Sequence, residues 1–170
     1  RNKAFHGLKK YLHKKRVRKT FLRALDHPSR VIRMYALDAL QQAFEPSYLP
    51  KFAEKALGDP DKHVRDTACW ALGSTQIPEA IPILKQASQD PETTKAAYYA
   101  LGCICHLESL HILLSALRSY PKHVKRLEEI ILVAIALRGV YNIATTIEIP
   151  DGTHEEIRQT VLSFLEHPNH

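Results

Sequence analysis

The chain has 170 residues, of which 45% are hydrophobic and 25% are charged, an ordinary composition for a folded protein. This length suits one domain or a short array of repeats. The longest apolar run, Ile130 to Leu137, has eight residues and is too short to span a bilayer. Three cysteines exclude a disulfide framework and are typical of the reducing cytoplasm, which is the location that we expect.

Charge is distributed unevenly along the chain. Residues 1–23 hold ten basic side chains and no acidic one, whereas residues 24–170 have a net charge of −4. A basic segment of this kind binds phosphate groups on nucleic acid or on anionic lipid. Because Leu8, Tyr11 and Leu12 recur at helical spacing, residues 1–23 are either a basic arm or the first helices of the fold. The candidate polyanion-binding side chains are Lys9, Lys10, Lys14, Lys15, Arg16, Arg18 and Lys19.

The chain then repeats itself. A shift of 32 residues places 27–58 on 59–90 with seven identities, three of which are prolines. The triplet Ala71-Leu72-Gly73 returns as Ala100-Leu101-Gly102 and, more weakly, as Ala136-Leu137-Arg138. Spacings of this size indicate an array of helical repeats.

Each unit has the pattern of two helices. Asp59-Pro60 and Asp90-Pro91 predict an N-cap aspartate followed by proline at the first helical position. The apolar stripe that follows is the expected buried face of the first helix, and Pro78 separates it from a second helix. Neither helix buries its stripe alone, so the units must stack. The predicted core includes Val64, Ala68, Ala71, Leu72, Ile83, Leu84, Ala97, Leu101 and Leu113.

One motif carries a family resemblance. Asp59-x4-Val64-Arg65, followed by Ala68 and Ala71-Leu72-Gly73, resembles the HEAT-repeat family, most closely the bacterial HEAT-like repeats first described in phycobilisome lyases. The resemblance covers roughly residues 20–118. It implies an all-α fold, a right-handed α-α superhelix (a HEAT-like solenoid) of about four helical-hairpin repeats, in which the Val-Arg helices line the concave face.

The same resemblance implies a polar ladder, because in the family the aspartate and arginine of successive units pair. By that resemblance Asp59 and Arg65 are structural, and Arg33 keeps its place. His27 stands in place of the aspartate and Thr94 in place of the arginine, so we expect the ladder to be incomplete.

A second similarity lies at the end of the chain. Leu25-Asp26-His27-Pro28-Ser29 returns, with changes, as Leu165-Glu166-His167-Pro168-Asn169. The second copy has the pattern that opens a repeat. We therefore expect residues 24–170 to be a HEAT-like repeat domain that is an excerpt of a longer array.

The sequence holds no convincing catalytic motif. Cys103-x-Cys105-His106 is its nearest approach to a metal site, but zinc sites need four ligands and there is no second cysteine pair. On a helix, residues 103 and 105 would point about 200° apart. Nucleophile-elbow and phosphate-loop patterns are absent. We expect no metal, no cofactor, no small-molecule substrate and no enzymatic activity.

A set of aromatic and charged positions favours protein binding instead. Trp70 lies about 140° from the centre of the buried stripe and Asp66 nearly opposite it. In the family geometry these positions line the concave groove, and tryptophan beside tyrosine is typical of protein-binding hot spots. The alternative is that Trp70 packs sideways and is buried. The candidate partner-binding side chains are Met34, Asp38, Asp66, Trp70, Lys95, Tyr98 and Tyr99.

The sequence therefore predicts a non-catalytic scaffold that docks another protein on its concave face. Two alternatives stay open. One is a nucleic-acid-binding protein resembling the HEAT-like DNA glycosylases, although the acidic body and single tryptophan lack their basic groove. The other is a cytoplasmic appendage of a membrane protein, with residues 1–23 as a polybasic juxtamembrane arm.

Overall fold

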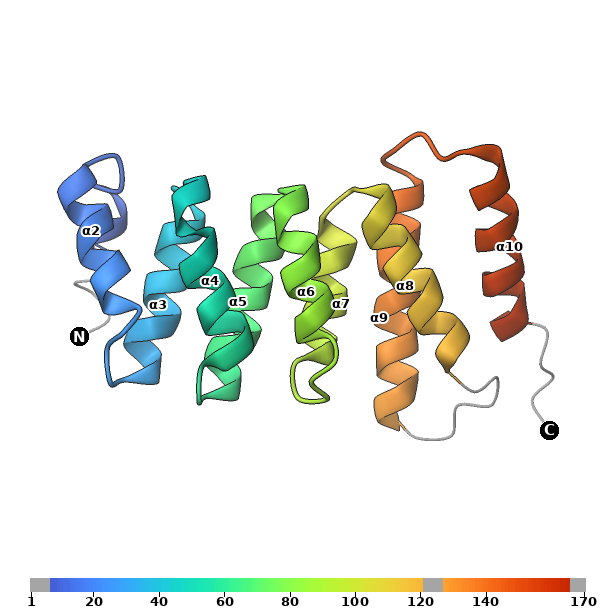
Figure 1. Ribbon diagram of the computed structural model, residues 1–170, viewed down its shortest axis with the longest axis horizontal. Helices are drawn as coiled ribbons and strands as arrows, with labels where there is room; N and C mark the ends of the chain where they lie inside the picture. The colour runs from blue at the N-terminus through green and yellow to red at the C-terminus, as the bar shows by residue number, and fades with distance from the viewer. Residues whose placement is uncertain (1–6, 121–126, 166–170) are drawn as a thin grey trace.

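The computed structural model describes residues 7–120 and 127–165, and every regular element in these residues is a helix (Figure 1). Two single-turn 3-10 helices, η1 (Pro46–Tyr48) and η2 (Pro78–Ala80), lead into α4 and α6. The α-helices are α2 (Lys15–Ala24), α3 (Arg30–Gln41), α4 (Leu49–Gly58), α5 (Lys62–Thr75), α6 (Ile81–Ala87), α7 (Thr94–Cys103), α8 (Leu107–Ser119), α9 (Leu127–Ala144) and α10 (Asp151–Leu165).

The helices form an α solenoid, as the repeats predict. In a first layer, α3, α5, α7 and α9 pack each against the next, and α4, α6 and α8 form a second layer over them. Figure 1 shows the pairs side by side along the long axis, with α2 at one end and α10 at the other. The surface of the first layer that is turned away from the second layer is called the first-layer face below.

Glycines set the spacing of the first layer. A Cβ atom on Gly73 would lie 2.7 Å from the Cα of Ala100, and one on Gly102 would lie 2.6 Å from the Cα of Gly139. Both distances are far below any real contact, so the backbones of α5, α7 and α9 touch directly. The Ala-Leu-Gly triplet is therefore a packing motif, and in α9 its glycine is Gly139, one residue later than the weak fourth copy places it.

The predicted core is largely confirmed. The alanines and leucines of the stripes are buried, including Ala68, Leu72 and Leu101 at 0% exposure. Ile83 is the exception and is only half-buried against the core. The buried stripe of α6 is Ile81, Leu84 and Ala87, and Ile83 lies about 100° from its centre.

The predicted N-cap of α5 is wrong by two residues. The helix begins at Lys62, and the carboxylate of Asp61 caps it by accepting a hydrogen bond from the backbone N–H of His63 at 2.9 Å. Asp59 ends the preceding helix instead. Its carboxylate accepts hydrogen bonds from the side chain of Arg33 and, at 3.0 Å, from the backbone N–H of Asp61.

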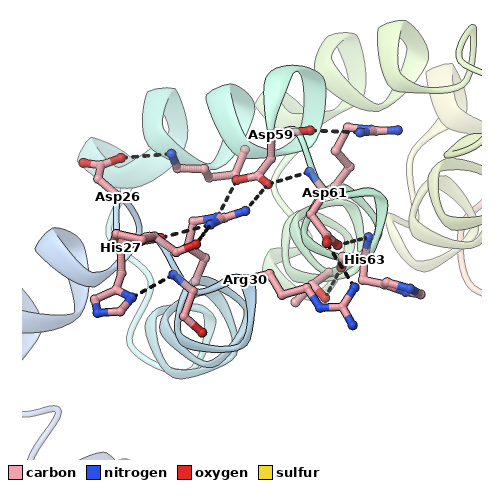
Figure 2. Close-up of polar contacts among 12 residues, drawn as sticks. Asp26, His27, Arg30, Asp59, Asp61 and His63 are labelled. Atoms are coloured by element: carbon pink, nitrogen blue, oxygen red, sulfur yellow. Dashed lines mark hydrogen bonds and ion pairs between the residues drawn. The ribbon is translucent and has the colours of Figure 1, made fainter.

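The polar ladder implied by the family resemblance is present (Figure 2). Arg33 donates two hydrogen bonds to Asp59, at 2.8 and 2.7 Å, and further ones to the carbonyl oxygens of His27 and Pro28. The Arg33 and Asp59 side chains are only 10% and 1% exposed. One buried guanidinium therefore joins the loop before α3 to the loop before α5.

The ladder continues for one further unit and, among the described residues, goes no further. Arg65 donates to the carbonyl oxygen of Asp59 at 2.9 Å and pairs with Asp90 at 3.4 Å and with Glu92. At the next arginine position, the hydroxyl of Thr94 donates to the carbonyl oxygens of Ser88 and Asp90, within its own turn. Thr94 therefore makes no bond to a described residue of the next unit.

We expect Gly102→Ala to lower the free energy of unfolding by about 1–3 kcal/mol, because the added methyl group has to separate two touching backbones. Gly58→Ala is the matched control, since a Cβ there meets nothing within 4 Å. That control should be neutral or slightly stabilising. Urea denaturation measures both, and equal losses would contradict the role assigned to the glycine contact.

We expect Asp59→Ala to lower the free energy of unfolding by about 3–5 kcal/mol, because it leaves the Arg33 guanidinium buried without its carboxylate. The control is Glu155→Ala, which removes a carboxylate that is 50% exposed and paired with Arg158. That surface pair should contribute little. If thermal denaturation shows the same small change for both variants, the ladder does not stabilise the array.

Candidate functional site

Two large aromatic side chains are exposed next to the closest approach of α5 and α7. Trp70 is 50% exposed and Tyr99 is 46% exposed. Gly73 of α5 and Ala100 of α7 are in direct contact. Trp70 stands three residues before Gly73, and Tyr99 stands one residue before Ala100. Trp70 therefore does not pack sideways into the next repeat. The two rings belong to neighbouring helices and to the first-layer face.

The acidic candidates on this face are already paired. Asp38 of α3 forms an ion pair with Lys9. Asp66, one turn before Trp70 on α5, forms an ion pair with Lys62 at 2.6 Å. Met34, the counterpart of Asp66 on α3, is half-buried against the core. On the part of the face formed by α3 and the start of α5, each of these carboxylates is therefore neutralised by a lysine of the same chain.

Tyr98 does not belong to this set. It is only 8% exposed, and burial together with a hydrogen bond to Tyr120 raises the pKa of Tyr98 to about 12. One residue along a helix is a rotation of about 100°, which turns Tyr98 away from Tyr99. Lys95, one turn before Tyr99, is exposed.

Helix α9 also contributes to the first-layer face, which was not predicted from the sequence. Ile131, Ala134, Arg138 and Tyr141 are all exposed and recur at the spacing of one helical stripe. Arg138 borders a small depression between α7 and α9 together with Tyr99. The repeats could have been aligned with Gly139 opposite Gly102, instead of with the Ala136-Leu137-Arg138 triplet opposite Ala100-Leu101-Gly102. That alignment would have predicted the exposed stripe of α9.

Comparison with family models agrees with this architecture. The model of the HEAT repeats matches residues 18–94 and, in an overlapping second match, residues 49–132. The chain belongs to the HEAT-repeat family. Proteins built from HEAT repeats are generally protein-interaction scaffolds and typically non-catalytic. The comparison with curated proteins found no match. The phycobilisome-lyase type of repeat stays a prediction.

At the N-terminal end of this HEAT-repeat array, two of the candidate polyanion-binding residues hold the fold together. Lys9 pairs with Asp38. Arg18 pairs with Glu45 at 2.9 Å and donates to the carbonyl oxygen of Leu12 at 2.8 Å. These two cations therefore connect the basic segment to the repeats and are not free for a ligand.

The other five candidate cations are exposed. The helix that carries three of them, α2, packs on α3 and buries Phe21 in the core. Lys14 lies over the exposed ring of Tyr11, with its Nζ 5.0 Å from the ring centroid. Arg23 adds a further exposed cation to α2. The five form no ion pair with a described residue and are Lys10, Lys14, Lys15, Arg16 and Lys19.

A cleft of about 950 Å³ opens where the ladder ends. It lies between the α6–α7 pair and the α8–α9 pair, and Thr94 forms part of its wall. Its lining mixes charges of both signs with two tyrosine hydroxyl groups. The principal lining side chains are Lys85, Lys95, Tyr98, Glu108, His111 and Tyr120.

The cysteine and histidine residues have structural surroundings. Burial raises the pKa of Cys69 to about 12 and also raises the pKa of Cys103, so neither thiol ionises near neutral pH. The imidazole of His106 accepts a hydrogen bond from the backbone N–H of Glu108 at 3.2 Å and caps α8. Within residues 7–120 and 127–165, no three potential metal ligands come together. In the same residues, no helix has the length and apolar character needed to cross a bilayer.

Proposed function

We propose that this HEAT-repeat chain is a non-catalytic scaffold that docks another protein on its first-layer face, with Trp70 and Tyr99 as the main contacts. The observation that carries the proposal is the half-exposed tryptophan. Its chain neighbours Cys69 and Ala71 are buried, so Trp70 is the residue of this helical turn that the core does not use. Trp and Tyr are the residue types most often found at binding hot spots.

The other members of the proposed site follow from the geometry. Lys95 and Arg138 lie on either side of Tyr99, and Ile131 adds exposed apolar surface on α9. Met34, Asp38 and Asp66 extend the site toward α3. Tyr98 is left out because it is buried. A reducing compartment such as the cytoplasm, expected from the sequence, would keep the three cysteines as free thiols.

We expect Trp70→Ala to weaken partner binding by about thirtyfold, which corresponds to about 2 kcal/mol for a hot-spot side chain. Tyr99→Ala should also weaken it. The partner is first isolated on the immobilised wild-type chain, and its dissociation constants for the wild type and each variant are then measured by titration. Because both rings are exposed, thermal unfolding should hardly change.

Tyr11→Ala is the matched control for these variants. Tyr11 is 47% exposed, almost the same as Tyr99, but it belongs to the basic segment before α2. The control should bind the partner like the wild type. If Tyr11→Ala and Tyr99→Ala weaken binding equally, or if Trp70→Ala has no effect, the first-layer face is not the docking surface.

A second candidate function is polyanion binding by the basic segment. The five exposed cations face solvent, while the apolar side chains of α2 are used in the core, so the contact would be electrostatic. The acidic body makes this end of the array the positive end of the molecule. The ligand would be a chain or surface of phosphate groups, on nucleic acid or on anionic lipid.

We expect the triple variant Lys15→Glu, Arg16→Glu and Lys19→Glu to elute from heparin at much lower salt than the wild type, because phosphate and sulfate contacts depend on counterion release. Substitution is preferable to removal of residues 1–23, since removal would take Phe21 out of the core. Lys85→Glu, an exposed lysine on α6, controls for charge alone.

The ligand class follows from parallel measurements with single-stranded DNA and with vesicles containing phosphatidylserine. A charge-dependent loss on DNA alone supports nucleic acid, and a loss on vesicles alone supports a membrane surface. Unchanged heparin retention by the triple variant, with a normal melting curve, would remove the basic segment as a polyanion site.

A further inference from the structure

Among the described residues, the unpaired charges on the first-layer face are positive. Its two described carboxylates form ion pairs with lysines of the same chain, Asp38 with Lys9 and Asp66 with Lys62. No such pairing reaches the other half of the face, because neither Lys95 nor Arg138 forms an ion pair with a described residue. The ion pairs among the described residues therefore leave Lys95 and Arg138 without an anionic partner.

Both unpaired cations lie near the ring of Tyr99, and Lys95 also lines the cleft that contains Glu108 and Glu129. Lys95 stands one turn before Tyr99 on α7, a separation at which side chains on a helix are neighbours. Arg138 reaches Tyr99 from α9, where the two residues border the same depression as Cys103. Tyr99 and Cys103, one turn apart on α7, both line this depression.

We infer that the segment docking on this face is an acidic peptide segment of another protein, with apolar side chains among its carboxylates. This inference rests on the proposed function and adds the chemistry of the partner. The apolar side chains would cover Trp70 and Tyr99, while carboxylates of the partner would pair with Lys95 and Arg138. A planar guanidinium suits a carboxylate because it donates two parallel hydrogen bonds.

Charge also decides which partners are rejected. When a partner covers the rings, water leaves the two cations beside them. A carboxylate replaces that hydration with a charge-assisted hydrogen bond, whereas a neutral or basic segment leaves each cation without a partner. The face therefore discriminates against basic segments that carry the same apolar side chains.

Nucleic acid is the other polyanion to consider, and this face suits it less. Binding to a phosphate backbone takes a series of cations, and six to ten contacts are common. Among the residues that the structure describes, this half of the first-layer face has two free cations, Lys95 and Arg138. The larger group of exposed cations lies on α2 and the segment before it, at the opposite end of the array (Figure 1).

A random peptide display library tests the inference without knowledge of the natural partner. Peptides are selected on the wild-type chain, and those that also bind Trp70→Ala are discarded. The peptides that remain depend on the first-layer face. We expect them to combine apolar residues with a clear excess of Asp and Glu over Lys and Arg, relative to the unselected library.

Reversal of both charges, at Lys95 and Arg138, tests whether these two residues bind the acidic peptide. The most enriched acidic peptide is synthesised and titrated against the variant Lys95→Glu with Arg138→Glu, where we expect binding to weaken by about tenfold or more at low salt. The control is Arg118→Glu with Arg158→Glu, which changes the net charge by the same amount at exposed arginines on α8 and α10, outside the first layer. The control should weaken binding by less than about twofold, because distant exposed charges are screened.

The outcomes separate the inference from the function on which it rests. Peptides that depend on Trp70 but are neutral or basic would overturn the acidic partner and leave the docking face in place. The same holds if the control reversal weakens binding as much as the reversal on the face. Displacement of the acidic peptide by single-stranded DNA would assign the cations to nucleic acid and overturn the inference. If no peptide depends on Trp70, the docking face itself fails, and the inference with it.

Discussion

Direct contact between the backbones of α5, α7 and α9 is the constraint on which the rest of this array depends. At Gly73 and Gly102, no side chain fits between the neighbouring helices α5, α7 and α9. Beside these contacts, a large side chain points into the second layer or away from it. Leucines and alanines take the first direction, and Trp70 and Tyr99 take the second. The same glycines that bring the helices together therefore leave the aromatic rings exposed.

The ion pairs of the chain determine which charges remain for a ligand. The ladder uses Arg33 and Arg65, and Lys9 and Arg18 attach the basic segment to the repeats. Among the described residues, the unpaired cations include the group on α2 and the segment before it, and Lys95 and Arg138 near Tyr99. Composition alone assigns positive charge to the first 23 residues and negative charge to the rest. Pairing changes this picture, because it removes the carboxylates of the first-layer face from the balance.

Much of the fold was predictable because it depends on local patterns that repeat. The buried stripes and the repeat spacing are properties of the sequence alone. The N-cap of α5 was not, because Asp59 and Asp61 are both suitable caps, and the pairing of Asp59 with Arg33 joins residues that are 26 positions apart. The stripe on α9 was missed for a similar reason, since its glycine is displaced by one residue from the triplet. Whether Trp70 faces solvent depends on how closely α5 and α7 approach each other. That distance cannot be predicted from the sequence of one helix alone.

The contact between Lys9 and Asp38 joins the two candidate surfaces. It brings the segment before α2 to α3, the helix with which the first layer begins, so the exposed cations of this segment lie near that end of the layer. The helices of the first layer then follow side by side from α3 to α9. An acidic segment that lies across them meets cations near α3, balanced ion pairs in the middle, and the aromatic rings with Lys95 and Arg138 beyond. Because charges of one sign lie at both ends of this path, a short acidic peptide and a long one use the face differently. The short one needs only Tyr99 and its neighbours, whereas the long one gains the cations near α3 as well.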